Sequence, residues 1–149
     1  MEIERKFLVI KELWKEFEKP SPSRIVQAYL LNSPEKTVRI RIKGTKGFLT
    51  IKGSTQGISR AEFEYEIPLE DAEELISSFA EKVIEKFRYE IAYKNHIWEV
   101  DVFAGKFEGL CLAEIELTSE DEYFELPEWI GEEVSTDPNY YNSNLIKNV

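Results

Sequence analysis

The amino-acid sequence predicts an α+β protein built mainly of antiparallel β-strands, closed into an eight-stranded β-barrel with flanking helices. Most of the chain alternates apolar and polar residues, as strands with two different faces do. Two other segments show the apolar spacing of amphipathic helices. The length suits one domain, residues 1–149, without a linker or a repeat. Eight strands suffice to close a barrel around one small ligand, although the same order of elements also fits an open sheet.

The alternating runs give the strands their expected bounds. They lie at Glu2–Val9, Ser23–Leu31, Thr37–Lys43, Gly47–Ser54, Ser59–Ile67, Val83–Tyr93, His96–Phe103 and Leu110–Thr118. Thr45-Lys-Gly47 separates two of these runs and is typical of a hairpin turn. Helices are expected over Ile10–Lys19 and Leu69–Lys82, and a shorter one around Tyr140 to Lys147.

Composition narrows the class of protein. A net charge of −10 argues against nucleic acid as a partner, because phosphate backbones recruit basic surfaces. No apolar run approaches the roughly 20 residues of a membrane span, so no membrane partner is expected. The single cysteine, Cys111, excludes an internal disulfide framework and favours a cytoplasmic protein. Any homodimer would use an outward apolar patch, which the pattern does not locate.

The polar faces of the strands carry charges that are sorted by strand. Acidic residues two apart occupy some strands: Glu2 and Glu4, Glu62 and Glu64, Glu99 and Asp101, Glu114 and Glu116. Basic residues two apart occupy others: Arg39 and Arg41, Lys86 and Arg88. One interpretation is an ordinary sheet with one face in water. Like charges two apart on one face repel, however, so a merely solvated face has no reason to collect them.

A ligand between the rows would explain the sorting. Paired carboxylates supply the oxygen ligands that Mg²⁺ or Mn²⁺ prefers, and these ions bridge to phosphates. Arginine and lysine pairs neutralise phosphate oxygens, with arginine adding bidentate geometry. A surface with both sets is suited to a metal-bound polyphosphate. The apolar faces then point outward and need cover, which the two amphipathic helices can supply.

Short motifs along the whole chain strengthen this interpretation. In order, they are Glu2-Ile-Glu-Arg-Lys6, Gln27-Ala-Tyr29-Leu30, Val38-Arg-Ile-Arg41, Leu49-Thr-Ile-Lys52, Arg60-Ala-Glu62-Phe-Glu64, Lys86-Phe-Arg88, Trp98-Glu-Val-Asp101, Leu112-Ala-Glu114-Ile-Glu116 and Tyr141-Asn-Ser-Asn-Leu145. Together they resemble the CYTH family, the triphosphate tunnel metalloenzymes, whose signature is Glu-x-Glu-x-Lys. The first motif alone would be weak, but ordered matches with consistent strand parity are specific.

The resemblance implies an eight-stranded antiparallel tunnel and metal-dependent hydrolysis of the terminal phosphate of a small-molecule triphosphate, either inorganic tripolyphosphate or a nucleoside triphosphate. It also implies roles for individual residues. Metal-binding residues would be Glu2, Glu4, Asp101, Glu114 and Glu116. Phosphate-binding residues would be Lys6, Arg39, Arg41, Lys52, Lys86 and Arg88. Glu62 or Glu64 would orient the attacking water, and Tyr29 would act near the tunnel mouth in proton transfer.

Two alternatives stay open at this point. A class IV-type adenylate cyclase would need a nucleoside pocket and a base for the ribose hydroxyl, and no feature of the sequence indicates a pocket for a base. A non-catalytic polyphosphate-binding module would not need Glu2, Glu4, Glu114 and Glu116 together. A hydrolase acting on phosphoanhydride bonds with Mg²⁺ or Mn²⁺ is therefore the favoured hypothesis.

Overall fold

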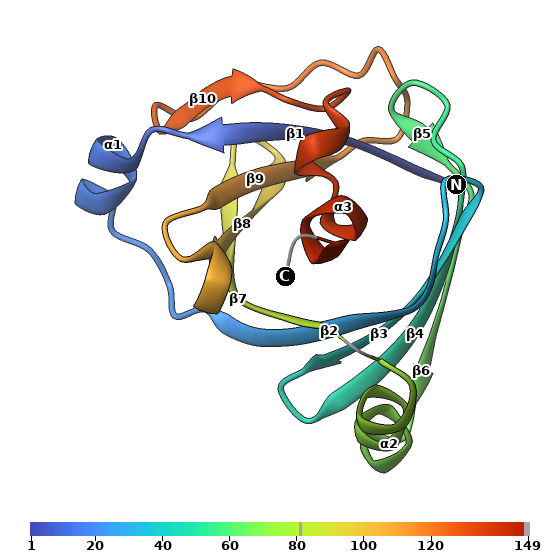
Figure 1. The fold of residues 1–149 in the computed structure, drawn as a ribbon. Helices are drawn as coiled ribbons and strands as arrows, with labels where there is room; N and C mark the ends of the chain where they lie inside the picture. Colours follow the sequence, from blue (N-terminus) through green and yellow to red (C-terminus); the bar gives the residue numbers. More distant parts are fainter. Residues whose placement is uncertain (81, 148–149) are drawn as a thin grey trace.

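One antiparallel β-sheet dominates the computed structural model, which describes residues 1–80 and 82–147. The sheet curves strongly, and a C-terminal helix lies on its concave side (Figure 1). The strands are β1 (Glu2–Val9), β2 (Ser23–Asn32), β3 (Lys36–Lys43), β4 (Lys46–Gly53), β5 (Ser59–Arg60), β6 (Glu62–Ile67), β7 (Val83–Tyr93), β8 (His96–Phe103), β9 (Cys111–Glu116) and β10 (Ile130–Glu133).

The helices are few and short. They are α1 (Lys11–Glu16), α2 (Leu69–Phe79), α3 (Asn142–Lys147) and the 3₁₀ turns η1 (Gly105–Phe107) and η2 (Pro138–Tyr140). Both long predicted helices end early, because Phe17 and Ala80 adopt extended backbone. Residue 81, which falls in the second prediction, lies outside the described residues. No helix in the described part of the chain is long and apolar enough to cross a membrane.

The predicted antiparallel sheet with few helices is confirmed, but the strand count is not eight. The sheet has ten strands, in the order β10-β1-β9-β8-β7-β2-β3-β4-β6, with β5 paired to β1 off this path. Ala61 divides the predicted strand Ser59–Ile67 into β5 and β6. Strand β5 pairs Arg60 with Glu2. Strand β10 was missed because it is four residues long and follows a stretch rich in glutamate.

The hairpin turn between β3 and β4 lies one residue earlier than predicted. Lys43 pairs with Lys46, so the turn is Gly44-Thr45 and Gly47 already belongs to β4. Gly44 has φ of 62°, a left-handed conformation that favours glycine and is typical of two-residue hairpin turns. The pairing of Lys43 with Lys46 also places Arg39 opposite Thr50, on the same face of the sheet.

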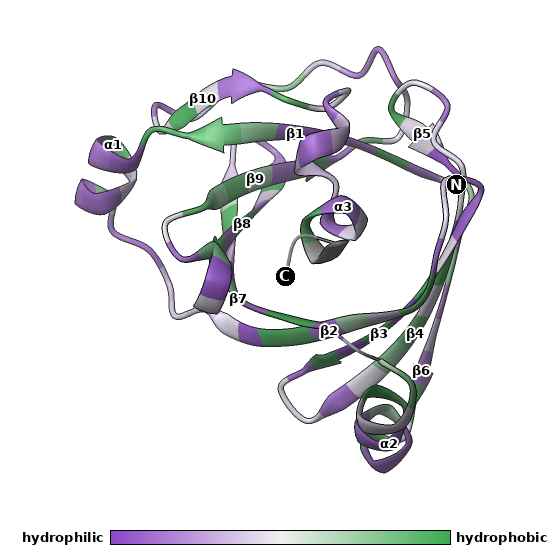
Figure 2. Ribbon diagram, in the orientation of Figure 1, coloured by the Kyte–Doolittle hydropathy of each residue, from purple (hydrophilic) through white to green (hydrophobic). Residues whose placement is uncertain are grey.

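The two faces of the sheet have opposite character. Apolar and polar residues alternate along the strands (Figure 2). The main core lies on the face of β1, β9, β8 and β7 that points away from the concave side, and Trp98 is fully buried there. The prediction that two helices cover the outward face holds for α1, whose Trp14 joins the core, and for α2, which packs against β3 and β4. Much of the cover, including Leu117 and Trp129, comes from the irregular segment after β9, which was not predicted to have this function.

A smaller apolar cluster positions α3. Leu145 packs with Ile84, Phe103 and Leu112 from three adjacent strands. Burial of these side chains holds α3 against the sheet. Its first residue, Asn142, thereby reaches the polar part of the concave side.

Replacing Gly47 with alanine is expected to destabilise the fold by about 1–3 kcal/mol, because α2 lies too close to β4 for an added methyl group. A Cβ at Gly47 would lie 2.6 Å from Cβ of Ala72 and 3.2 Å from the carbonyl oxygen of Ile67. Gly53 on the same strand is the matched control, since its added Cβ would lie 3.7 Å from Cβ of Ala61, an ordinary contact. Urea denaturation of the two variants should separate them, and equal stabilities would contradict this packing.

Candidate active site

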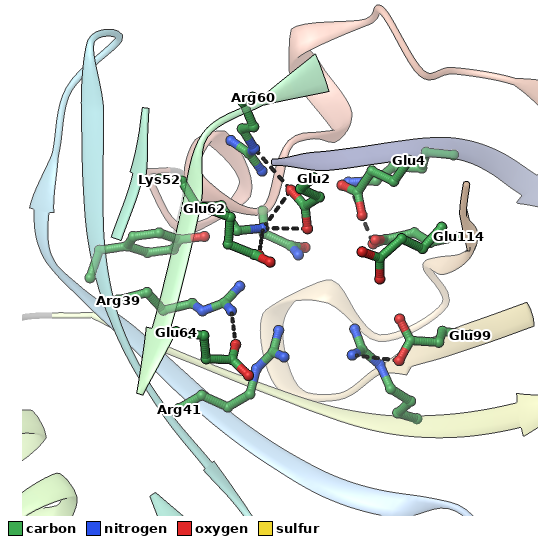
Figure 3. A pocket seen from close by; sticks show the side chains of 15 residues that line it. Glu2, Glu4, Arg39, Arg41, Lys52, Arg60, Glu62, Glu64, Glu99 and Glu114 are labelled. Atoms are coloured by element: carbon green, nitrogen blue, oxygen red, sulfur yellow. Dashed lines mark hydrogen bonds and ion pairs between the residues drawn. The ribbon is translucent and has the colours of Figure 1, made fainter. Parts of the chain in front are cut away.

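A charged cavity of about 180 Å³ lies on the concave side of the sheet (Figure 3). Side chains from opposite parts of the sheet converge on it, and α3 contributes one residue. It is lined by Glu2, Glu4, Lys6, Tyr29, Arg39, Arg41, Lys52, Arg60, Glu62, Glu64, Arg88, Glu99, Glu114, Glu116 and Asn142. Every predicted site residue lines this cavity except Lys86 and Asp101. The acidic and basic rows of different strands therefore face one another across a shared space.

Carboxyl groups meet in pairs on the acidic side of the cavity. Glu4 on β1 lies beside Glu114, which stands on the neighbouring strand β9 (Figure 3). Burial and the negative charges of Glu114 and Glu2 raise the pKa of Glu4 well above its usual value. Burial also opposes ionisation of Glu114, but Lys6 and the proton on Glu4 outweigh it and hold its pKa well below the usual range. The two buried carboxyl groups thus disfavour ionising together in the absence of a cation.

A second carboxyl pair lies beside the first. Glu2 and Glu62 both pair with Lys52, whose Nζ lies 3.0 Å from Glu2 and 3.3 Å from Glu62. Burial opposes ionisation of Glu2, but Lys52 and Arg60 outweigh it and lower its pKa. Burial raises the pKa of Glu62 despite Lys52. Glu116, on β9, extends this acidic side, and its pKa is raised by burial and by Glu2.

Three guanidinium groups lie on the basic side. Arg39 donates to Thr50 Oγ1 at 3.2 Å and lies 3.8 Å from Glu64. Arg88 forms a bidentate pair with Asp101, with both distances 2.8 Å. Burial lowers the pKa of Arg41 to about 9, and the charges of Arg39 and Arg88 add to this effect. Mutual repulsion of these groups marks a position where an anion would be stabilised.

The resemblance implied a phosphate-binding role for Lys86 and a metal-binding role for Asp101, but neither residue lines the cavity. Both are buried beneath the cavity, where Nζ of Lys86 lies 2.7 Å from Oδ2 of Asp101. This contact is an ion pair that lacks the alignment of a hydrogen bond. Burial opposes ionisation of Asp101, but Lys86 and Arg88 outweigh it and lower its pKa. Burial lowers the pKa of Lys86 to about 7. In this arrangement Asp101 anchors cations and does not reach the carboxylate cluster.

Three cavity residues were not predicted as site residues. Nε of Arg60 lies 3.2 Å from Glu2, and Glu99 lies 3.2 Å from Arg88. Both residues stand at the strand parity of predicted neighbours, Glu62 and Asp101, so parity alone could have found them. Asn142 lies in the motif Tyr141-Asn-Ser-Asn-Leu145 and enters the cavity through the packing of α3, which the sequence pattern does not predict.

The acidic side has the chemistry of a divalent-cation site. Its donors are carboxylate oxygens, which Mg²⁺ and Mn²⁺ prefer. Among the described residues no three acidic, histidine or cysteine side chains already converge at metal-binding distances. Glu2, Glu4, Glu114 and Glu116 nevertheless line one cavity, and a bound cation would relieve the repulsion between their ionised carboxylates. The residues present therefore fit such an ion.

A curved antiparallel sheet with opposed carboxylate and guanidinium rows in one cavity defines a class of small-polyanion-binding proteins. Comparison with known proteins identifies the family within that class. The chain belongs to the CYTH domain family, which matches residues 1–147.

Individual relatives agree with this assignment. The chain is 49% identical to an inorganic triphosphatase of Acetivibrio thermocellus over 148 residues, covering 99% of this chain and 94% of the relative. It is 39% identical to an inorganic triphosphatase of Nitrosomonas europaea, covering 97% of this chain and 95% of the relative. A crystal structure of an inorganic triphosphatase superposes with a TM-score of 0.69 at 34% identity, covering 100% of this chain and 96% of the other.

Proposed function

We propose that this protein is an inorganic triphosphatase that hydrolyses the terminal phosphoanhydride bond of a small-molecule triphosphate with the help of Mg²⁺ or Mn²⁺. The two relatives named above, which this chain matches along nearly its whole length, support the activity. The cavity supports the substrate class, because its lining is entirely polar or charged apart from the Tyr29 ring. Such a lining suits a phosphate chain and offers no apolar surface to a nucleotide base.

The observation that carries the proposal is the set of cavity arginines that repel one another. Arg41 lines the cavity together with Arg39 and Arg88, and its pKa is lowered to about 9 by burial and by those two charges. A protein gains no stability from such an arrangement, since each cation disfavours the others. A triphosphate supplies several anionic oxygens at once, and guanidinium groups bind these in bidentate fashion. The strain in the free protein is thus relieved in the complex.

Phosphoryl transfer needs mainly positioning and charge stabilisation from the protein. Arg39, Arg41 and Arg88 would bind the phosphate oxygens and stabilise the charge that develops on the transferred group. Lys6 and Lys52 would extend this binding toward the acidic side, where they already contact Glu114 and Glu2. The leaving diphosphate would keep these contacts after the bond breaks.

Glu2, Glu4, Glu114 and Glu116 would hold the cation. A divalent ion held there would neutralise part of the negative charge of the phosphate chain. Lys86 and Asp101 are left out of the phosphate and metal sets because they pair with each other below the cavity. Mg²⁺ and Mn²⁺ are both proposed because carboxylate-rich sites prefer such hard cations.

Glu62 is the better candidate for orienting the attacking water. Its raised pKa brings its basicity closer to that needed for proton transfer near neutral pH. Glu64 already accepts a hydrogen bond from Thr50 at 3.0 Å and lies near Arg39. Tyr29 would assist proton transfer from its place on the cavity wall.

The proposed architecture is a single tunnel-shaped domain. The β5–β1 pairing links the segment that precedes β6 to β1, so the curved sheet would enclose the cavity as a closed barrel. Enclosure would lower the local dielectric constant and strengthen every charge interaction with the substrate.

Incubation with tripolyphosphate or ATP, each with Mg²⁺ or Mn²⁺, tests the function directly. Orthophosphate and diphosphate should appear from tripolyphosphate in equal amounts. Cyclic AMP from ATP would instead identify a cyclase. A rise in melting temperature with metal and tripolyphosphate but without turnover would identify a binding module. Either of these last two results would overturn the proposal.

A further inference from the structure

Arg41 is held by a neutral partner. Gln27 on β2 stands directly opposite Arg41 on β3 in the sheet. Its Oε1 accepts hydrogen bonds from Nε and Nη2 of Arg41 at 3.2 and 3.1 Å. The Gln27 side chain is fully buried, so its packing fixes the edge of the guanidinium that it contacts. The opposite edge of that group is left to face the cavity.

The other guanidinium groups of the cavity are held by acids. Arg88 pairs with Asp101 and Glu99, Arg60 pairs with Glu2, and Arg39 lies 3.8 Å from Glu64. Within the described residues, Arg41 is the cavity arginine with no ion pair to a carboxylate. Its anchor supplies hydrogen-bond geometry but no negative charge, so the carboxylate of Asp101 acts on Arg41 only from a distance.

The Gln27 amide also loses a hydrogen bond by taking this orientation. Its Nε2 is buried and has no hydrogen-bond partner among the described residues. A buried donor without a partner lowers stability. Turning the amide over would place this donor against the N–H groups of Arg41, so the acceptor requirement of Arg41 fixes the orientation. A residue that only filled space here would carry no such penalty.

We infer that Gln27 is a positioning residue that holds Arg41 without a direct carboxylate partner and thereby sets the affinity of the cavity for the triphosphate chain. A glutamate at this position would hold Arg41 equally well but would compete with the phosphate for its charge. The inference rests on the proposed function, because it concerns the same cavity and the same substrate class.

The Gln27→Glu variant tests the inference. With tripolyphosphate and Mn²⁺, KM should rise by roughly tenfold or more, with a smaller change in kcat. The melting temperature should be unchanged or higher, because the new carboxylate pairs with Arg41. The defect in KM should shrink as pH falls and this carboxyl group becomes protonated. Gln56→Glu is the matched control, since Gln56 is the other glutamine of the chain, is exposed and lies outside the cavity lining.

A second variant separates charge from packing. Gln27→Met keeps the volume and removes the acceptor, so its KM should rise less than that of Gln27→Glu, by an amount independent of pH. Equal defects in the two variants across the pH range would overturn the inference, as would a normal KM in Gln27→Glu. Calorimetric titration of the same variants with tripolyphosphate alone should give the same order of affinity. This binding measurement decides the matter even if the wild-type protein shows no hydrolysis, which would count against the proposed function only.

Discussion

The Asp101→Asn variant is expected to lose about 3–5 kcal/mol of unfolding free energy, because it leaves two buried cations without their shared counter-ion. Asp101 forms a bidentate pair with Arg88 and an ion pair with Lys86, and all three side chains are buried. Lys86 can lose its proton, since its pKa is already lowered to about 7, but Arg88 cannot. Guanidinium chloride denaturation should show a lower midpoint with an unchanged slope.

The pH dependence of this loss has a definite sign. The pKa of Asp101 is lowered from its ordinary value of 3.8, so its contribution to stability is complete above that pH and is lost as the pH falls below it. Wild-type stability should therefore decline more steeply below about pH 4 than that of Asp101→Asn. Asp121→Asn removes the charge of an exposed aspartate and should behave like wild type. An Asp101→Asn protein as stable as this control would show that the buried network contributes nothing.

The Glu4→Gln variant is expected to lose turnover while keeping or gaining stability. Glu4 belongs to the proposed cation-binding set, and a cation in a phosphoryl-transfer site supplies several kcal/mol of charge stabilisation. Losing this stabilisation should reduce the rate of hydrolysis by a factor of about 100 or more. Phosphate release from tripolyphosphate at saturating Mn²⁺ measures this effect. Glu132→Gln, an exposed change on β10, serves as the matched control.

Stability should move in the opposite direction because of the raised pKa of Glu4. A carboxyl group whose folded pKa lies above its ordinary value of 4.5 costs the metal-free protein stability as pH rises through that interval. Glutamine cannot ionise, so the variant escapes this loss. Its melting temperature without metal at pH 8 should equal or exceed that of wild type. Normal turnover, or a fall in both turnover and melting temperature, would contradict the role given to Glu4.

Strand parity accounts for most of what the sequence predicted correctly. Alternation along β1, β3 and β9 indicated that Glu4, Arg39 and Glu116 share a face, and all three line the cavity. Strand parity does not predict, however, which residues on the same face are buried and which reach the cavity. Lys86 and Asp101 have the expected parity, yet both are fully buried, whereas their strand neighbours Arg88 and Glu99 reach the cavity. That difference follows from three-dimensional packing.

Other features depend on contacts between distant segments. Strand β10 forms where the segment after residue 127 meets β1, and its short sequence has no pattern of its own. The place of Asn142 depends on burial of Leu145 against three strands. The neutral anchor of Arg41 depends on the pairing of β2 with β3, which places Gln27 opposite it. The first two contacts join segments far apart in the sequence, and the third depends on the register of a hairpin, so periodicity could not predict them.

The side chains of β1 alternate between the cavity on one face of the sheet and the main core on the other. Glu4 and Lys6 lie in the cavity, and Phe7 lies in the main core. Deleting a single residue near the middle of this strand would turn every following side chain to the opposite face. Such a deletion would place a lysine among the tryptophans and a phenylalanine among the phosphate-binding cations. Length variation within β1 is therefore incompatible with both folding and chemistry.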